Sequence, residues 1–177
     1  MDLSVGLSTY VMMSAFLSAD VAPAFGIGAD VRGEVLGIGA EARFVLPSRA
    51  YARERIPGAS SSYPQEFDLS ELSVSLVPCA RYKYFVGCGV AHVGALMWQT
   101  ANANGMGVSF GLGPRIGFEV PFAERFAVFG FGEVLFTPSK NTLLFNLPDP
   151  KYPDEPAANT QWVQSVASGF FGAGVSV

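Results

Sequence analysis

Ionisable side chains of both signs recur at alternate positions within apolar stretches of this chain. Between positions 108 and 120, Arg115 and Glu119 share one parity with glycines and a serine, whereas apolar residues occupy the other parity. The charged residues that follow this rule are Asp30, Arg32, Glu41, Arg43, Arg115, Glu119 and Glu133. A period of two defines a β-strand, so we expect these side chains on one face of a sheet. There they can neutralise one another as an ion-pair network.

The two cysteines offer a second chemistry. Cys79 and Cys88 lie symmetrically about the bond between Lys83 and Tyr84, so a tight hairpin places them opposite each other. We expect a disulfide formed in an oxidising compartment, which contributes about 2 to 3 kcal/mol, with free thiols as the alternative. The parity of the two residues leaves open which face of the sheet the disulfide occupies. With His92 they still lack a fourth ligand at a recognised spacing, so we expect no metal site.

His92 is the only histidine, and the same hairpin register places it opposite Ser75. A histidine beside a serine is the minimum for nucleophilic catalysis, as in a lipid-modifying enzyme. No acidic third member is evident beside the pair, so we expect a hydrogen-bonded wall histidine and no enzyme activity. Glycines such as Gly26 and Gly28 recur at spacing two on strands rather than before a helix, so we expect no cofactor.

Eight strand-like segments must position these residues. Alternation and turn residues delimit 3–17, 25–32, 35–46, 69–80, 84–100, 106–120, 126–137 and 161–177. Long loops at 47–68 and 138–160 hold eight of the twelve prolines, which marks them as solvated surface segments. Tight turns alternate with the loops, so we expect an antiparallel up-and-down meander. The chain reads as one domain over residues 1–177.

The first segment also has features of an export signal that ends in small residues. It carries Asp2 and no Lys or Arg before its apolar stretch, and its apolar residues alternate with small polar ones. We therefore expect a strand here, with the export signal upstream and removed.

Composition indicates where the apolar faces point. Half of the 177 residues are hydrophobic and 15% are charged, yet no run reaches the roughly 18 to 20 apolar residues of a membrane helix. Glycine, serine and sparse charges on the opposite face suit a crowded, hydrated interior. The sequence therefore predicts an all-β, eight-stranded antiparallel up-and-down transmembrane β-barrel with a lumen filled by side chains. A net charge of −4 without a basic cluster argues against nucleic acid as a partner.

Four residues fit the alternation badly. Pro78 and Pro114 each remove a backbone donor inside a strand, and Phe129 and Phe131 share the parity of the charged Glu133. We expect a bulge or kink that resets parity there.

Aromatic residues gather near both ends of the strands. Tyr82 and Phe122 lie near tight turns, and Trp98, Phe136 and Trp162 lie near loops. We expect two girdles at the membrane interfaces.

Three stretches carry a family resemblance: GIGAEARFVLP at 37–47, VPCARYKYFVGCGVAHVGAL at 77–96 and GLGPRIGFEVPF at 111–122. Through them nearly the whole chain resembles the small eight-stranded outer-membrane barrels of Gram-negative bacteria, the OmpA-like membrane domains. It departs at Val177, where such barrels often end in an aromatic residue. The resemblance implies a multi-pass outer-membrane location, lipid around a monomer, and a structural or surface-interaction role. Extracellular or envelope partners would meet loops 47–68 and 138–160.

Two other classes of protein remain open. A soluble, lipocalin-like barrel would bind a small apolar ligand, but it requires an apolar lumen and a polar exterior, which the charge parity opposes. A lipid-modifying outer-membrane enzyme would require Ser75 and His92 to be accessible from one membrane leaflet.

Overall fold

The computed structural model describes residues 3–16, 21–54, 65–100, 103–138, 142–147 and 158–177. The described residues form ten β-strands. Among these residues there is no helix long and apolar enough to cross a membrane. The strands are β1 (Ser4–Phe16), β2 (Ala22–Arg32), β3 (Leu36–Glu54), β4 (Gln65–Tyr82), β5 (Phe85–Gln99), β6 (Asn104–Ala123), β7 (Phe126–Phe136), β8 (Thr142–Leu147), β9 (Ala158–Val163) and β10 (Ala167–Ser176).

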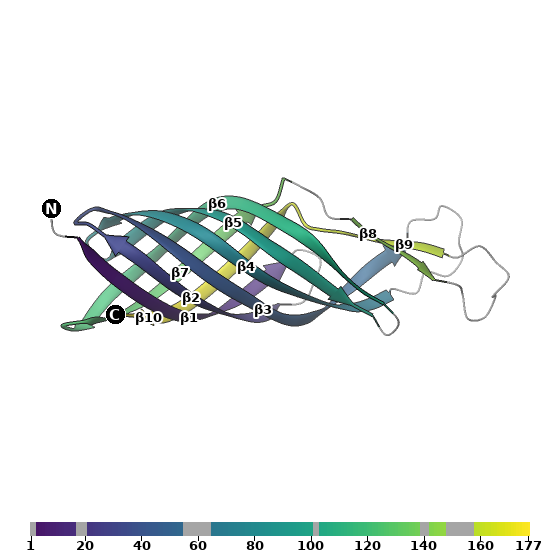
Figure 1. The fold of residues 1–177 in the computed structure, drawn as a ribbon, viewed down its shortest axis with the longest axis horizontal. Helices are drawn as coiled ribbons and strands as arrows, with labels where there is room; N and C mark the ends of the chain where they lie inside the picture. Colours follow the sequence, from purple (N-terminus) through teal and green to yellow (C-terminus); the bar gives the residue numbers. More distant parts are fainter. Residues whose placement is uncertain (1–2, 17–20, 55–64, 101–102, 139–141, 148–157) are drawn as a thin grey trace.

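Eight of these strands close into an antiparallel barrel (Figure 1). From β1 to β7 each strand pairs with the next along the chain, and β10 pairs with both β7 and β1 to close the ring. Both chain ends and the tight turns lie at one end, which we call the terminus end, and the opposite end is the loop end. The predicted eight-stranded up-and-down barrel is confirmed, and the first segment is the strand β1.

The predicted boundaries at the loop end are wrong. Strands β3 and β4 continue as a paired ribbon into the expected loop 47–68, with a register shift between Val45 and Ser48. Pro47 lies at this shift. A residue in a bulge is not paired with the neighbouring strand, so the missing N–H of the proline costs no ladder hydrogen bond and the strand continues. Residues 55–64, the middle of that predicted loop, lie outside the described residues.

The predicted loop 138–160 also contains regular structure. Strands β8 and β9 form a hairpin, and β9 pairs with the end of β3 through Arg53↔Gln161 and Glu54↔Thr160. The expected last strand, 161–177, is therefore divided between β9 and β10. Sequence alternation did not reveal the hairpin because its two short strands lie within a proline-rich stretch.

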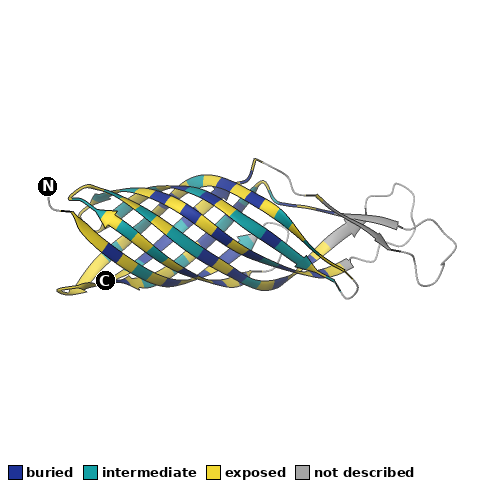
Figure 2. Ribbon diagram, in the orientation of Figure 1, coloured by how far each residue is buried: buried dark blue, intermediate teal, exposed yellow. Residues whose placement is uncertain are grey.

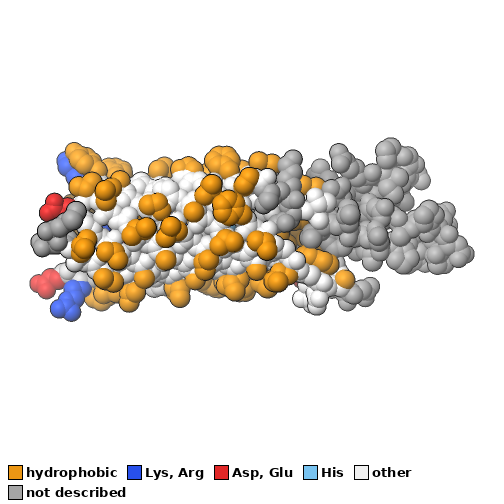
Figure 3. All heavy atoms as spheres, turned by 45° about the horizontal axis from the view of Figure 1, so that its top comes forward, with side chains coloured by type: hydrophobic (Ala, Val, Ile, Leu, Met, Phe, Trp, Pro, Cys, Tyr) orange, Lys and Arg blue, Asp and Glu red, His pale blue; other side chains and the backbone are white. Residues whose placement is uncertain are grey.

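Side chains of the barrel strands alternate between two environments. Buried and exposed residues follow one another along each strand in Figure 2. Outward positions are apolar and exposed, for example Leu7 (58%), Val74 (55%) and Ile116 (73%). Figure 3 shows hydrophobic side chains spread over the barrel surface, with charged side chains at the terminus end. Such a surface is costly in water and matches lipid, so the outer face of the barrel is its membrane face.

Two prolines each interrupt the pairing of two neighbouring strands without changing the strand register. The β4–β5 ladder skips two pairs at Pro78, and the β6–β7 ladder skips two pairs at Pro114, yet the register on either side is unchanged. The expected parity reset is therefore wrong. A proline removes one N–H but adds no residue, so inward and outward positions keep their order.

Candidate functional site

Four charged side chains meet in the middle of the lumen and form the central cluster. Arg43 donates from Nη1 and Nη2 to the two carboxylate oxygens of Glu133, at 2.6 and 3.0 Å. Arg115 donates to both oxygens of Glu41, at 2.6 and 2.8 Å, and from Nε to Glu133 at 2.7 Å. Their side chains are at most 12% exposed, so each charge depends on its partners for compensation.

Aromatic side chains complete the surroundings of the central cluster. The hydroxyl of Tyr10 donates to Glu41 Oε2 at 2.8 Å. The Arg115 guanidinium lies 4.5 Å from the ring centroid of Phe131, and Phe129 stacks on Phe131. Both phenylalanines face inward with Glu133, and Phe131 covers the guanidinium of Arg115.

A second group, the mouth cluster, lies at the terminus end of the lumen. Arg32 donates to Asp30 and, at 2.6 Å, to Glu119. Arg81 Nη2 lies 3.6 Å from Asp30 and 3.5 Å from Glu119. These side chains are 18 to 21% exposed, so the mouth cluster is better hydrated than the central one.

All seven charges predicted for the lumen lie there, divided between these two clusters. Arg81 completes the mouth cluster, although the sequence assigned it to a turn. Strand β4 runs on to Tyr82, and Arg81 continues the inward parity of Cys79. Extending the alternation by one residue would have found it.

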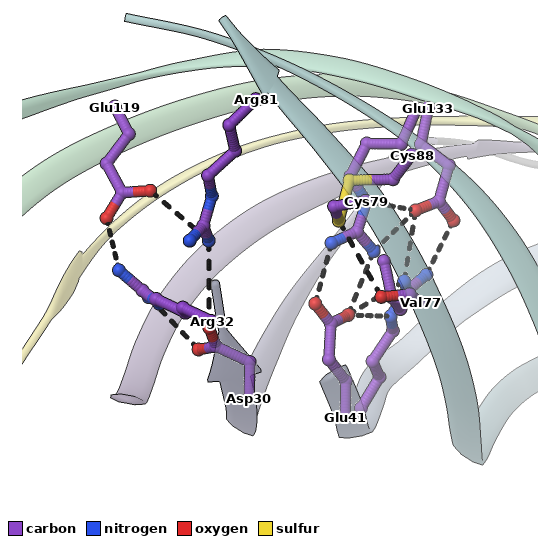
Figure 4. The surroundings of a disulfide bond; sticks show 11 residues. Asp30, Arg32, Glu41, Val77, Cys79, Arg81, Cys88, Glu119 and Glu133 are labelled. Carbon is purple, nitrogen blue, oxygen red and sulfur yellow. Dashed lines mark hydrogen bonds and ion pairs between the residues drawn. A yellow bond between two sulfur atoms is a disulfide. The ribbon is translucent and has the colours of Figure 1, made fainter. Parts of the chain in front are cut away.

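The predicted disulfide joins Cys79 and Cys88 across β4 and β5, with the Cα atoms 4.1 Å apart. It lines a lumen cavity of about 100 Å³ that both charge clusters also line. Figure 4 shows the disulfide beside the central cluster, with the mouth cluster to one side. The disulfide therefore occupies the inner face of the sheet, a choice that parity alone left open. The cavity is lined by charged side chains of both clusters as well as by apolar ones, and it is large enough for several water molecules.

A third group, the histidine cluster, lies deeper toward the loop end. His92 Nδ1 is 3.2 Å from Ser75 Oγ, and His92 Nε2 is 2.8 Å from Glu71 Oε1. The hydroxyl of Ser109 donates to the same oxygen of Glu71. All four residues are at most 5% exposed.

Glu71 is the acidic partner that sequence reasoning missed. It shares the inward parity of Ser75, four residues away on β4, so parity together with the hairpin register could have found it. Serine, histidine and carboxylate here have the connectivity of a nucleophilic triad. Ser75 is 4% exposed, so the serine is buried in this structure.

No group of three or more histidine, cysteine, aspartate or glutamate residues suited to a metal ion occurs in the described part of the chain.

Buried apolar side chains form a cluster at the loop end of the barrel, which we call the loop-end plug. Its members are Ala50, Phe67, Leu69, Leu96, Trp98 and Trp162. Phe67 and Trp162 meet edge to face at 5.9 Å, and Trp162 is 3% exposed. A Cβ on Gly105 would lie 2.3 Å from the Trp98 ring, so glycine is required for this packing. The expected interfacial position of both tryptophans is therefore wrong, because they point inward.

A closed barrel with an apolar outer face and a charged lumen defines a transmembrane barrel of the outer-membrane type. No family model and no curated protein matches this chain. Solved structures do. OprG from Pseudomonas aeruginosa aligns with a TM-score of 0.64 at 12% identity, over 98% of this chain and 94% of its own.

Two further structures show the same likeness. A major outer membrane protein from Thermus thermophilus gives a TM-score of 0.61 at 11% identity, over 98% of each chain. Neisserial surface protein A gives 0.56 at 14% identity, over 100% of this chain and 99% of its own. At these identities the likeness concerns the fold, which confirms the outer-membrane barrel inferred from the sequence. Together with the apolar exterior, it identifies the chain as an integral outer-membrane barrel.

Proposed function

We propose that this barrel is a monomer with a closed lumen, and that its role is structural or lies in contacts made by its loop end. The terminus end faces the periplasm and the loop end faces the cell exterior. The observation that supports this proposal is the presence of two clusters of buried side chains at different levels of the barrel, the central cluster and the loop-end plug. A barrel without a path for solutes acts through its surfaces.

Each level blocks passage by a different physical means. At the central cluster, two arginines and two glutamates bond across the lumen, and a passing ion would have to displace those partners. At the plug, Phe67, Leu69 and Trp162 are at most 3% exposed and exclude water. An ion would therefore have to leave its hydration shell.

Planar-bilayer recording tests the closed lumen. The purified full chain is expected to give no steady current, and Phe67→Ala combined with Trp162→Ala is expected to admit brief openings only, because the central cluster remains. A steady ohmic current through the wild-type protein would contradict the proposal and indicate a pore.

The loop end provides the surface for partners. Strands β3 and β4 continue past the last β5 pairing, Asp68↔Gln99, and the β8–β9 hairpin is joined to β3. Along the chain, residues 55–64 follow β3 and residues 148–157 follow β8. Neisserial surface protein A, which shares the fold, is by its name a surface protein.

Loop replacement in intact cells tests this role. Exchange of residues 55–64 and 148–157 for short Gly/Ser linkers is expected to leave folding unchanged and to abolish attachment of the cells to extracellular ligands. A matched exchange of the turn at Glu124 and Arg125, at the terminus end, is the control. If attachment is unchanged after the loop exchange, the contact role is contradicted and the structural role remains.

We also propose that the barrel is not an enzyme, although the Ser75–His92–Glu71 chain favours a lipid hydrolase as the second candidate. Mass spectrometry of lipids from cells that make the wild-type protein or Ser75→Ala is expected to show identical acyl compositions. A deacylated lipid formed only by the wild-type protein would establish the hydrolase instead.

A further inference from the structure

The disulfide between Cys79 and Cys88 lies inside the barrel, beside the central cluster (Figure 4). Both cysteines are half-buried on the inner face of the sheet, where they line the lumen cavity of about 100 Å³. The outer face of the same strands is the membrane face, and the sheet separates the disulfide from lipid. A reagent can therefore reach the two sulfur atoms only through the lumen.

The route from the terminus end is narrow. Arg81 and Val86 form the next inward pair toward the turn. Arg81 Nη2 extends across the mouth to Asp30 at 3.6 Å and to Glu119 at 3.5 Å. The interior of an eight-stranded barrel is only wide enough for side chains. Water and small reagents fit into this space, whereas a folded protein does not.

Enzymes that exchange disulfides need direct contact with sulfur. The exchange passes through a mixed disulfide, in which a sulfur atom of the enzyme is bonded to a sulfur atom of its substrate. In the closed barrel this bond could form only if the reactive cysteine of the enzyme entered the lumen, which the width of the lumen prevents. An enzyme can therefore act on Cys79 and Cys88 only while the lumen is open on one side.

The two cysteines can meet before the barrel closes. They are nine residues apart in one hairpin, whose turn has Lys83 in the left-handed region at φ 56°. Closure instead requires β1 to pair with β10, at the opposite end of the chain. Contacts between neighbours in sequence cost less chain entropy and form faster than contacts between distant segments. The hairpin therefore provides a stage at which the thiols are adjacent and still accessible.

We infer that the disulfide between Cys79 and Cys88 is made before the barrel closes, by a protein thiol oxidase that acts on the open chain in the periplasm. The thiolate of one cysteine attacks the disulfide of the oxidase, and one oxidase cysteine leaves as a thiolate. The second cysteine of the chain then attacks the mixed disulfide and releases the other oxidase cysteine. The chain loses two electrons and two protons, and the oxidase disulfide becomes a dithiol.

Closure of the barrel then protects the product. In the open hairpin the bond is accessible to enzymatic exchange, whereas in the barrel it is enclosed, so protein reductants and isomerases cannot reach it. The mouth cluster is 18 to 21% exposed and hydrated, so small reagents still pass. The size of the reagent therefore decides whether it reaches the sulfur atoms of the folded protein.

Oxidation of the reduced full chain tests this order of events. The chain is refolded in detergent micelles or kept unfolded in dilute urea, and is then mixed with a bacterial periplasmic thiol oxidase in its disulfide form. Alkylation of the remaining thiols with a polyethylene glycol maleimide, read on a denaturing gel, gives the rate. We expect oxidation of the folded barrel to be at least about 100-fold slower, because the enzyme must wait for the barrel to open. Equal rates would overturn the inference.

The small oxidant diamide separates access from reactivity. It is expected to oxidise the reduced folded barrel, which would show that the two thiols are adjacent and reactive and that size alone excludes the enzyme. A reduced chain that does not fold at all would support the same order of events, since the disulfide must then precede closure.

An exposed cysteine at the same end of the barrel is the matched control. Cys88→Ser leaves Cys79 as the single thiol, and Glu124→Cys combined with Cys79→Ser and Cys88→Ser places one thiol in an exposed turn. Each folded variant is mixed with a thiol oxidase whose reactive cysteine carries a nitrothiobenzoate group, which an attacking thiolate displaces as a coloured ion. We expect release by Cys79 to be at least about 100-fold slower than release by the thiol at position 124. Equal release would show that an enzyme reaches the lumen of the closed barrel, against the inference.

Discussion

At the scale of single residues, burial decides what an ion pair contributes. Arg43 and Glu133 are 1% and 0% exposed, whereas Arg32 and Glu119 in the mouth cluster are 21% and 18% exposed. Water screens the second pair and is excluded from the first. Removal of one partner of a buried pair leaves the other charge unpaired and away from water. The resulting loss of unfolding free energy exceeds the loss on breaking a hydrated pair.

The substitution Glu133→Gln is therefore expected to lower the free energy of unfolding by about 3 to 5 kcal/mol, because it leaves Arg43 without its bidentate acceptor. Glu119→Gln in the mouth cluster is the control, with an expected loss of about 1 kcal/mol or less. Urea unfolding from lipid vesicles measures both. Equal losses would contradict the difference in hydration.

At the scale of elements, the β4–β5 hairpin combines a weak ladder with a covalent link. Pro78 interrupts the ladder, and the disulfide between Cys79 and Cys88 joins the strands at the next pair. The β6–β7 pair repeats the arrangement without a covalent bond, since Arg115 bonds to Glu133 at the pair next to Pro114. In both places a lumen-side link adjoins a gap in the sheet.

Replacement of both cysteines by serine is expected to reduce the free energy of unfolding by about 2 to 3 kcal/mol, through the lost constraint on the unfolded chain. Urea unfolding with and without a reductant measures it. The reductant should affect only the wild-type protein. An unchanged midpoint in the double variant would show that the disulfide adds nothing to this hairpin.

Pro78→Val in the cysteine-free protein is expected to recover about 1 kcal/mol, because it restores a backbone donor between β4 and β5. The same urea assay measures the gain. No gain would mean that the ladder gap has another cause than the missing N–H.

At the scale of the whole molecule, the outer face requires lipid or detergent. The apolar side chains that cover it would aggregate in water, and the closed ring leaves no free edge in the barrel itself. After refolding in micelles, the protein is expected to migrate as a compact monomer band that boiling converts to a slower one. A folded monomer in detergent-free buffer would contradict the membrane assignment.

A single charged substitution tests which part of the membrane face lies in the hydrocarbon layer. Val74 is 55% exposed on the membrane face of β4, midway along the strand. Val74→Arg is expected to cost about 2 to 4 kcal/mol of unfolding free energy in vesicles. Glu66→Arg, on an exposed position of the same strand at the loop end, is the control and should be nearly neutral. A nearly neutral Val74→Arg would place Val74 outside the hydrocarbon layer.

Alternation along the chain predicted the inward position of seven charged side chains. Parity is a local property of an extended chain, so alternation assigned Glu41, Arg115 and Glu133 to the inner face before any strand was paired. It also located the hairpin that joins Cys79 to Cys88. It failed at the loop end, where prolines masked the continuation of β3 and the β8–β9 hairpin.

Contacts across the lumen, between strands that are not neighbours, could not be predicted from the sequence. Arg43 and Glu133 lie 90 residues apart in the sequence, and their bond depends on closure of the barrel and the stagger of its strands. Trp162 joins the loop-end plug because β9 pairs with the end of β3. Periodicity along one strand carries no information about contacts across a lumen, because those contacts depend on how all eight strands are arranged together.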